Sequence, residues 1–165
     1  MPGAGKTTLA RGLSAELKLP LVSKDEIKEQ LYDELGVGDV EWSRRLGRAA
    51  YALIFVFVHE LLAAQQSVIA EANFFRGSDE QRLAGLPRHR LVQIHCSVPL
   101  ELLRQRYRAR DRHPGHLAAE RANELEGRMR TGVHDALALD GELLEVDTSA
   151  PVDVRAIADR IRSTP

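Results

Sequence analysis

The sequence predicts a single α/β domain built around a parallel β-sheet. Short apolar segments of strand length alternate along the chain with longer segments that carry apolar residues at helical spacing. Polar and charged residues directly follow several of the strand-like segments, and ligands of open parallel sheets bind at the carboxyl ends of the strands. The 165 residues have the length of one ordinary domain, so we expect residues 1–165 to form one unit.

Apolar spacing and turn residues place the individual elements. The predicted strands are residues 19–23, 67–71, 91–96 and 143–146. The predicted helices are residues 6–18, 25–35, 43–65, 79–86, 99–110, 117–130 and 152–163. Leu9, Leu13 and Leu17 recur every four residues and give the first helix its apolar stripe, while Gly36 ends the second helix. Ser43 is the predicted N-cap of the third helix.

The third helix contains the longest apolar run of the chain, residues 49–58. Ten residues are too short to span a bilayer, and His59 and Glu60 follow at once, so we expect no membrane partner. Because this part of the helix is apolar nearly all round, it predicts packing on both sides.

The chain opens with a glycine-rich segment that matches the end of a phosphate-binding loop. The pattern G-x-x-x-x-G-K-[ST] ends at Gly5, Lys6 and Thr7, while its first glycine would stand one position ahead of Met1. We therefore expect that the chain begins inside its own active site, and that the strand feeding the loop, ending in that glycine, precedes Met1. The alternatives are a fragment, or another segment that takes the place of the strand.

The residue types of this loop suit a nucleotide phosphate. The predicted cofactor-binding residues are Gly3, Ala4, Gly5, Lys6, Thr7 and Thr8. Backbone N–H groups of the loop would surround the β-phosphate at the N-terminus of the first helix. Lys6 would reach the β- and γ-phosphates, and the Thr7 hydroxyl would bind Mg²⁺. The alternative is an ordinary glycine-rich turn before a helix with a chance lysine.

Charged residues follow the first predicted strand. Asp25 stands at its carboxyl end, where a carboxylate can accept the proton of an acceptor hydroxyl during phosphoryl transfer. Lys28, one helical turn further on, could hold an anionic part of the acceptor. The alternative is helix capping by Ser23 or Asp25, with Glu26 in the first turn, and the two roles are compatible.

A second polar pair follows the next predicted strand. Glu71 ends that strand, where an acidic residue can hold Mg²⁺ through water, and Asn73 stands two residues later. A role in binding metal or water, direct contact of Glu71 or Asn73 with substrate, and a solvated acid at a strand end all remain open.

Five arginines occupy alternate positions between 104 and 112. Mobile arginines can close over the γ-phosphate, so Arg106, Arg110 and Arg112 are candidate catalytic residues on a lid over 104–130. Arg106 could also stack on adenine as a flat cation. The alternatives are a solvated basic helix and an RNA-binding patch, the latter supported only by Tyr107.

Composition limits the classes of partner and the compartment. The formal net charge of −1 gives no global field for nucleic acid or an anionic membrane. The single cysteine, Cys96, suits a reducing compartment. The start has neither the basic nor the apolar region of a signal peptide, so we expect a cytoplasmic protein.

Together these segments resemble the small P-loop kinases of the zeta-toxin and chloramphenicol-phosphotransferase type, a group that includes predicted kinases labelled AAA family ATPases. The matching positions are residues 3–10, 21–28, 68–74, 112–116 and 146–149, together with His95, Cys96, Pro99, Arg106 and Arg110. The resemblance implies a three-layer α/β/α P-loop fold with five parallel strands, of which the first is missing or truncated here. It also implies ATP and Mg²⁺ as cofactors, Asp25 as the acceptor-activating carboxylate, an arginine lid, and Thr148 near adenine.

The leading interpretation is therefore an ATP-dependent kinase that phosphorylates a hydroxyl of a small molecule. One alternative is a polynucleotide 5′-hydroxyl kinase, which the near-neutral charge argues against. The other is a nucleotide-binding protein without turnover. Acceptor specificity is expected in residues 36–48, where Trp42, Arg44 and Arg45 could line a pocket; an exposed loop anchored by Trp42 is the alternative.

Overall fold

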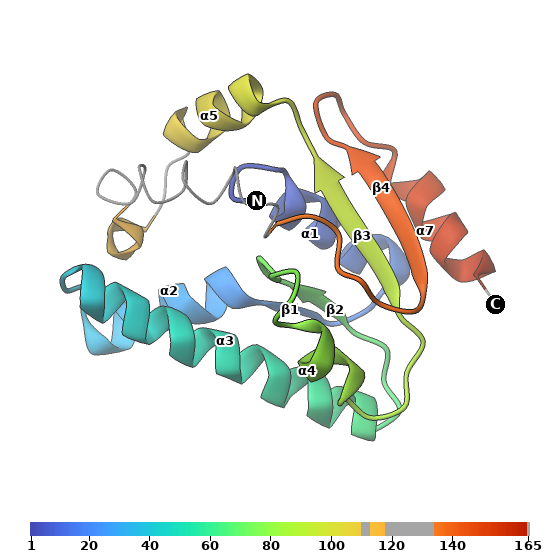
Figure 1. The fold of residues 1–165 in the computed structure, drawn as a ribbon, viewed down its shortest axis with the longest axis horizontal. Helices are drawn as coiled ribbons and strands as arrows, with labels where there is room; N and C mark the ends of the chain where they lie inside the picture. Colours follow the sequence, from blue (N-terminus) through green and yellow to red (C-terminus); the bar gives the residue numbers. More distant parts are fainter. Residues whose placement is uncertain (110–112, 118–133, 165) are drawn as a thin grey trace.

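The computed structural model describes residues 1–109, 113–117 and 134–164, and it confirms the predicted α/β fold (Figure 1). The strands are β1 (Leu21–Ser23), β2 (Ile69–Glu71), β3 (Val92–Ser97) and β4 (Glu142–Asp147). The helices are α1 (Lys6–Leu17), α2 (Lys24–Leu35), α3 (Val40–Ala63), α4 (Glu80–Ala84), α5 (Leu100–Ala109), the 3₁₀ turn η1 (Pro114–His116) and α7 (Val154–Ser163). The predicted helix over 117–130 lies almost entirely outside the described residues.

The strands form two separate parallel pairs. β1 pairs with β2, with Ser23 opposite Glu71, and β3 pairs with β4, with Ser97 opposite Asp147. Each pair is joined through helices, as parallel strands require. Because both partners of a pair run in the same direction, Ser23 and Glu71 end side by side, and so do Ser97 and Asp147. Four of the predicted site residues, Asp25, Glu71, Asn73 and Thr148, stand at or just beyond these carboxyl ends.

One edge of β2 and one edge of β3 pair with no strand among the described residues. The part of the chain that the structure describes contains four strands, so the fifth strand that the resemblance implies is not seen there. Ile69 of β2 and Ile94 of β3 nevertheless pack against the same apolar cluster, which is built around Leu9 and Leu13 of α1. Helix α1 thus supports both strand pairs from one side.

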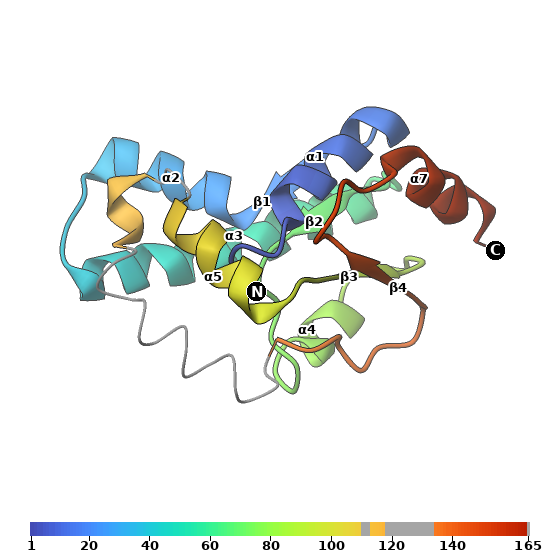
Figure 2. The same ribbon diagram turned by 90° about the horizontal axis from the view of Figure 1, so that it is seen from above.

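Helices cover the β1–β2 pair on both faces, which gives this part of the molecule its layers (Figures 1 and 2). Ile69 packs in the α1 cluster, whereas the next residue, Ala70, packs in a second cluster around Ile54 and Val58 of α3. This alternation follows from the two-residue repeat of a strand. Helix α7 lies against α1 and adds Ala158, which is fully buried, to the α1 cluster.

The third helix begins earlier than the sequence predicted. Asp39, not Ser43, is its N-cap, and Asp39 Oδ1 accepts a hydrogen bond of 2.8 Å from the Trp42 backbone N–H. Ser43 lies one turn inside the helix and is buried. Both residue types cap helices well, but only Asp39 directly follows the glycine turn that ends α2.

Helix α3 packs on one side only, so the prediction of packing on both sides was wrong. Val56 and Phe57 are 52% and 45% exposed, whereas Ile54 and Val58 are buried. With 24 residues and a mean hydropathy of 1.6 in its most apolar window, α3 is long and apolar enough to cross a membrane by length and composition alone. Core helices of soluble proteins pass the same test, and α3 is packed against α2 and β1.

Candidate active site

The glycine-rich segment forms a tight loop that leads directly into α1. Gly3 and Gly5 have positive φ angles of 87° and 76°, a conformation that favours glycine. Gly5 is the N-cap of α1 and supplies no side-chain cap, so N–H groups of the first helical turn are left for another acceptor. Lys6 and Thr7 are half-buried, and Thr8 is exposed. An anion is the natural ligand of such a helix start.

The loop is held between two other parts of the chain. A Cβ atom at Gly3 would lie 3.2 Å from the carbonyl oxygen of Leu103 in α5, and one at Gly5 would lie 3.2 Å from Cβ of Thr148. Ala4, between them, is only 2% exposed. Figure 2 shows the start of the chain beside α5, in agreement with these contacts. The backbone of the loop is therefore fixed on both sides before any ligand binds.

The acidic residues Glu71 and Asp25 lie close enough to Lys6 for their charges to affect its pKa. Its Nζ donates a hydrogen bond of 2.6 Å to the carbonyl oxygen of Met1. Burial lowers the pKa of Lys6, while the negative charges of Glu71 and Asp25 oppose that shift. The structure thus brings together the loop lysine and the two carboxylates that follow β1 and β2.

Glu71 is buried and held by its strand partner. Ser23 Oγ donates a hydrogen bond of 2.8 Å to Glu71 Oε2. Ser23 is the N-cap of α2 by position, but its hydroxyl serves Glu71 and caps no helix N–H. The described residues contain no group of three or more His, Cys, Asp or Glu that could hold a metal. One carboxylate and one hydroxyl would suit Mg²⁺, which keeps several waters of its own.

Asp25 lies in the first turn of α2 and is ionised. Burial alone would raise the pKa of its carboxyl group. The ion pair with Lys24, with 3.0 Å between Nζ and Oδ1, and the neighbouring His116 and Lys6 outweigh burial and lower that pKa to about 2. An ionised carboxylate at the start of a helix also agrees with the helix dipole.

Two of the predicted substrate residues are engaged elsewhere. Lys28 is 1% exposed; its Nζ donates 3.0 Å to Ser43 Oγ and lies 5.1 Å from the centre of the Tyr32 ring. Arg45 is exposed on α3, with its guanidinium over the Trp42 ring at 5.4 Å. The acceptor-binding roles of Lys28 and Arg45 therefore stay predictions that this arrangement does not favour.

Asn73 offers a polar group that the protein leaves unused. Its side chain is half-buried just beyond the end of β2, two residues after Glu71. The Oδ1 atom is buried and has no hydrogen-bond partner within residues 1–109, 113–117 and 134–164. Leaving a buried acceptor unpaired costs about 1–3 kcal/mol, which a ligand donor would offset.

The arginine segment is described only in part. Arg106 lies on α5 and donates a hydrogen bond of 2.8 Å from Nη2 to the carbonyl oxygen of Thr148. Thr148 itself is 5% exposed. Arg110, Arg112 and much of the predicted lid lie outside the described residues.

Sequence reasoning missed how the segment after α5 is anchored on α2. His113 stacks on Tyr32 with 5.1 Å between ring centres, and its Nε2 lies 3.1 Å from Asp33 Oδ1. His116 Nε2 lies 2.9 Å from Glu29 Oε1. The spacing of the two histidines by three residues, matched by acidic residues four apart on a helix, was the available signal.

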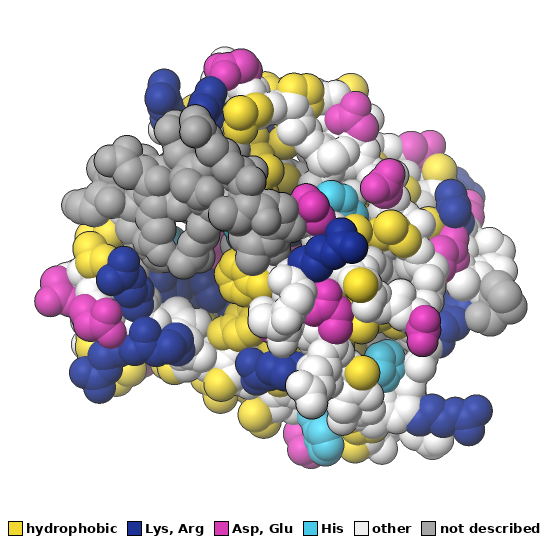
Figure 3. Space-filling model, in the orientation of Figure 1, with side chains coloured by type: hydrophobic (Ala, Val, Ile, Leu, Met, Phe, Trp, Pro, Cys, Tyr) yellow, Lys and Arg dark blue, Asp and Glu magenta, His cyan; other side chains and the backbone are white. Residues whose placement is uncertain are grey.

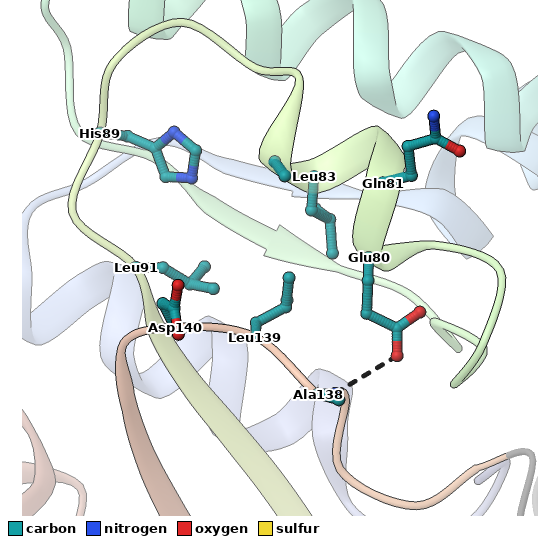
Figure 4. Close-up of a pocket in the computed structure, with 9 residues that line it drawn as sticks. Glu80, Gln81, Leu83, His89, Leu91, Ala138, Leu139 and Asp140 are labelled. Atoms are coloured by element: carbon teal, nitrogen blue, oxygen red, sulfur yellow. Dashed lines mark hydrogen bonds between the residues drawn. The ribbon is translucent and has the colours of Figure 1, made fainter.

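A cavity of about 460 Å³ lies away from these residues (Figure 4). It opens between α4 and the segment before β4, near the amino end of β3, and Leu83, Leu91 and Leu139 supply apolar walls. The Glu80 carboxylate accepts a hydrogen bond of 3.2 Å from the Ala138 N–H beside it. None of the predicted site residues lines this cavity.

Comparison with protein families gives a direct match. A family model described as an AAA domain, AAA_33, matches residues 1–131, which include the loop, Asp25 and Glu71. The chain belongs to the AAA_33 family. No curated protein matches this AAA_33 sequence.

Solved structures extend this result to the whole AAA_33 chain. A candidate kinase from Chloroflexus aurantiacus is 36% identical, with a TM-score of 0.91 over 99% of this chain and 94% of that one. A sugar kinase from Janibacter sp. has a TM-score of 0.62 at 17% identity, covering 98% and 88%. Shikimate kinase from Acinetobacter baumannii, in complex with shikimate, has a TM-score of 0.50 at 16% identity, covering 98% and 86%. The last two likenesses concern the fold alone.

Proposed function

We propose that this AAA_33 protein is a phosphotransferase that moves the γ-phosphate of Mg-ATP to a hydroxyl group of a small molecule. The observation that carries the proposal is the meeting of Lys6, at the start of α1, with the ionised Asp25 that follows β1. A phosphate-binding helix start beside a carboxylate supplies the two halves of a phosphoryl transfer site. The likeness to the candidate kinase from Chloroflexus aurantiacus supports the same reaction class.

Nucleotide binding would depend on the loop and on two oxygen ligands. The free N–H groups after Gly5 and the Lys6 ammonium would hold the phosphates. The residues fit a magnesium ion: Thr7 follows the lysine, and Glu71 has one oxygen fixed by Ser23 and a second left to accept from metal-bound water. The ion, when bound, would offset the negative charge of the transferred phosphoryl group.

Asp25 would orient the acceptor. With a pKa of about 2 the carboxylate is fully ionised at neutral pH, so it can accept a hydrogen bond from the attacking hydroxyl. So weak a base takes the proton late, as the bond to phosphorus forms, which suits a loose transition state. Asn73 would add a second contact, because its buried Oδ1 lacks a donor and a polyol or similar acceptor brings one.

The charge distribution favours a small acceptor over a nucleic acid. The formal net charge is −1, and acidic and basic side chains are interspersed over the face shown in Figure 3. Nucleic-acid binding depends on neutralising many phosphates with a continuous basic surface. A polynucleotide kinase is therefore the weaker candidate.

The test is transfer of a labelled γ-phosphate from Mg-ATP to a panel of sugars, polyols, hydroxy acids and nucleosides. Lys6→Ala and Asp25→Asn are expected to abolish transfer. Glu34→Gln, an exposed change on the same helix as Asp25, is the matched control and is expected to leave it intact. Nucleotide binding without any phosphorylated product would instead identify a nucleotide-binding protein without turnover.

A further inference from the structure

Thr148 connects three parts of the site through its hydroxyl and backbone. The residue directly follows β4 and is 5% exposed. Its Oγ1 lies 3.1 Å from the carbonyl oxygen of Ala4 in the loop and 3.1 Å from that of Ser97 at the end of β3. Its backbone N–H donates 2.9 Å to Ser97 as well. Ser97 therefore keeps a donor if the hydroxyl is lost, whereas Ala4 loses the donor that Thr148 provides.

The same side chain also fixes the shape of the loop. The three Thr148 side-chain atoms beyond Cα lie 3.2 to 3.4 Å from the place where Gly5 would carry a Cβ atom. Gly5 has a φ of 76°. The peptide between Ala4 and Gly5 is held by the hydrogen bond from Thr148 to the Ala4 carbonyl oxygen and by the close packing of the Thr148 side chain against Gly5. The orientation of this peptide decides where the following N–H groups point.

Arg106 is connected to the loop through Thr148. Its Nη2 donates 2.8 Å to the Thr148 carbonyl oxygen, and its Nη1 lies 3.5 Å from Thr148 Oγ1. Helix α5, which carries Arg106, also contacts Gly3 through Leu103. The Arg106 guanidinium is therefore already held near the loop, so its side chain would need little rearrangement to contact a bound phosphate.

We propose that Thr148 is a positioning residue of the nucleotide site: it sets the orientation of the loop peptide at Ala4 and holds Arg106 beside the loop. The part that concerns phosphate binding rests on the proposed function. Thr148 then acts through these two groups and not by touching adenine, because its hydroxyl is buried and already bonded.

The first experiment is hydrogen–deuterium exchange of the nucleotide-free protein, read at a peptide that contains residues 3–8. Thr148→Val keeps the shape and removes the hydroxyl, so it is expected to speed exchange there, while Thr148→Ser restores protection. Ser149→Ala, an exposed neighbour, is the matched control. Arg106→Gln removes the guanidinium that donates to the Thr148 carbonyl oxygen, and it is expected to speed exchange at the same peptide. Unchanged exchange in Thr148→Val and Arg106→Gln would overturn the proposal.

The second experiment is a double-mutant cycle on the dissociation constant of a fluorescent ADP analogue. Thr148→Val and Arg106→Gln are each expected to weaken binding about tenfold, and the double variant hardly more, because coupled residues are not additive. A loss of about a hundredfold in the double variant would contradict the coupling. If the unmodified chain binds no nucleotide, the proposed function fails, while the exchange result still decides whether Thr148 positions the loop.

Discussion

Ser23 and Glu71 end two neighbouring parallel strands and are joined there by a hydrogen bond of 2.8 Å. Both side chains are buried, and the bond fixes the Oε2 atom of the Glu71 carboxylate. Glu71, if it holds the ion through water as proposed, is an outer partner of the metal, and loss of such partners typically costs about 10- to 100-fold in metal affinity or activity. The register that places Ser23 opposite Glu71 thus also sets the orientation of the Glu71 carboxylate.

Removing this pair is expected to change the magnesium requirement. Glu71→Gln keeps the size of the side chain but loses the charge, and it should raise the Mg²⁺ concentration that gives half-maximal phosphoryl transfer by about 10- to 100-fold. Ser23→Ala should shift it in the same direction by less, because Glu71 stays charged. Titration of Mg²⁺ at fixed ATP measures both. Equal magnesium curves for Glu71→Gln and the unmodified protein would exclude Glu71 from metal binding.

Asp25→Asn is expected to reduce the rate of transfer by about 10²- to 10⁴-fold with little change in nucleotide affinity, because the proposed role of the carboxylate is toward the acceptor and not the nucleotide. The pKa of Asp25 lies near 2, below its ordinary 3.8. The ionised carboxylate therefore contributes fully to the free energy of unfolding above pH 3.8, and this contribution is lost as the pH falls toward 2. The rate of the unmodified enzyme should therefore show no ionisation of Asp25 between about pH 5 and 8. Measuring the transfer rate against pH for the unmodified enzyme and for Asp25→Asn checks both the loss of rate and the absence of an Asp25 ionisation.

The sequence predicted the elements and the phosphate loop because both are local. The spacing of Leu9 and Leu13 alone marks the buried face of α1. Gly5 and Lys6 belong to a short sequence motif that predicts a tight loop before this helix. Parallel strands also bring their carboxyl ends together, and the carboxylates of Asp25 and Glu71 both act on the charge of Lys6.

What the sequence did not show depends on contacts between distant segments. Lys28 looks like an exposed helical lysine until α3 brings Ser43 against it, across 15 residues. Thr148 looks like a loop residue near a ligand until β4 places it against Ala4, across 144 residues. Spacing cannot reveal such partners, because nothing local distinguishes a buried polar group from an exposed one.

Gly115 is expected to tolerate no side chain. A Cβ atom there would lie 2.6 Å from ring atoms of Tyr32, which is itself buried and bonded to Ser43. Gly115→Ala should therefore destabilise the protein by about 1–3 kcal/mol, the usual cost of overpacking. Gly85→Ala, whose Cβ would meet its nearest atom at an ordinary 3.4 Å, is the control. Urea unfolding of both variants gives the comparison, and equal losses would mean that the 113–116 segment moves aside freely.

In a polypeptide prepared to start at Met1, the buried amino group of this residue is expected to make stability depend on pH. Burial and the nearby Lys6 lower its pKa from 8.0 to about 5, so the folded chain binds this proton less readily than the unfolded chain. Stability should therefore rise with pH between about 5 and 8, by at most about 4 kcal/mol, and fall as the pH is lowered through that window. Melting temperatures across this range measure it. A chain with a short glycine-serine extension ahead of Met1 has an amide in place of the amine and should lose most of the dependence.

The unpaired edges of β2 and β3 allow a sharper comparison at the same end of the chain. We expect an extension of β-branched apolar residues ending in glycine to pair with both edges, and each backbone hydrogen bond contributes roughly 1 kcal/mol. The glycine-serine extension removes the buried charge but forms no strand. We expect the apolar extension to raise the free energy of unfolding well above that of the glycine-serine chain, and to tighten nucleotide binding because the strand would lead directly into the loop. Equal stabilities of the two extended chains would show that the edges at Ile69 and Ile94 accept no further strand.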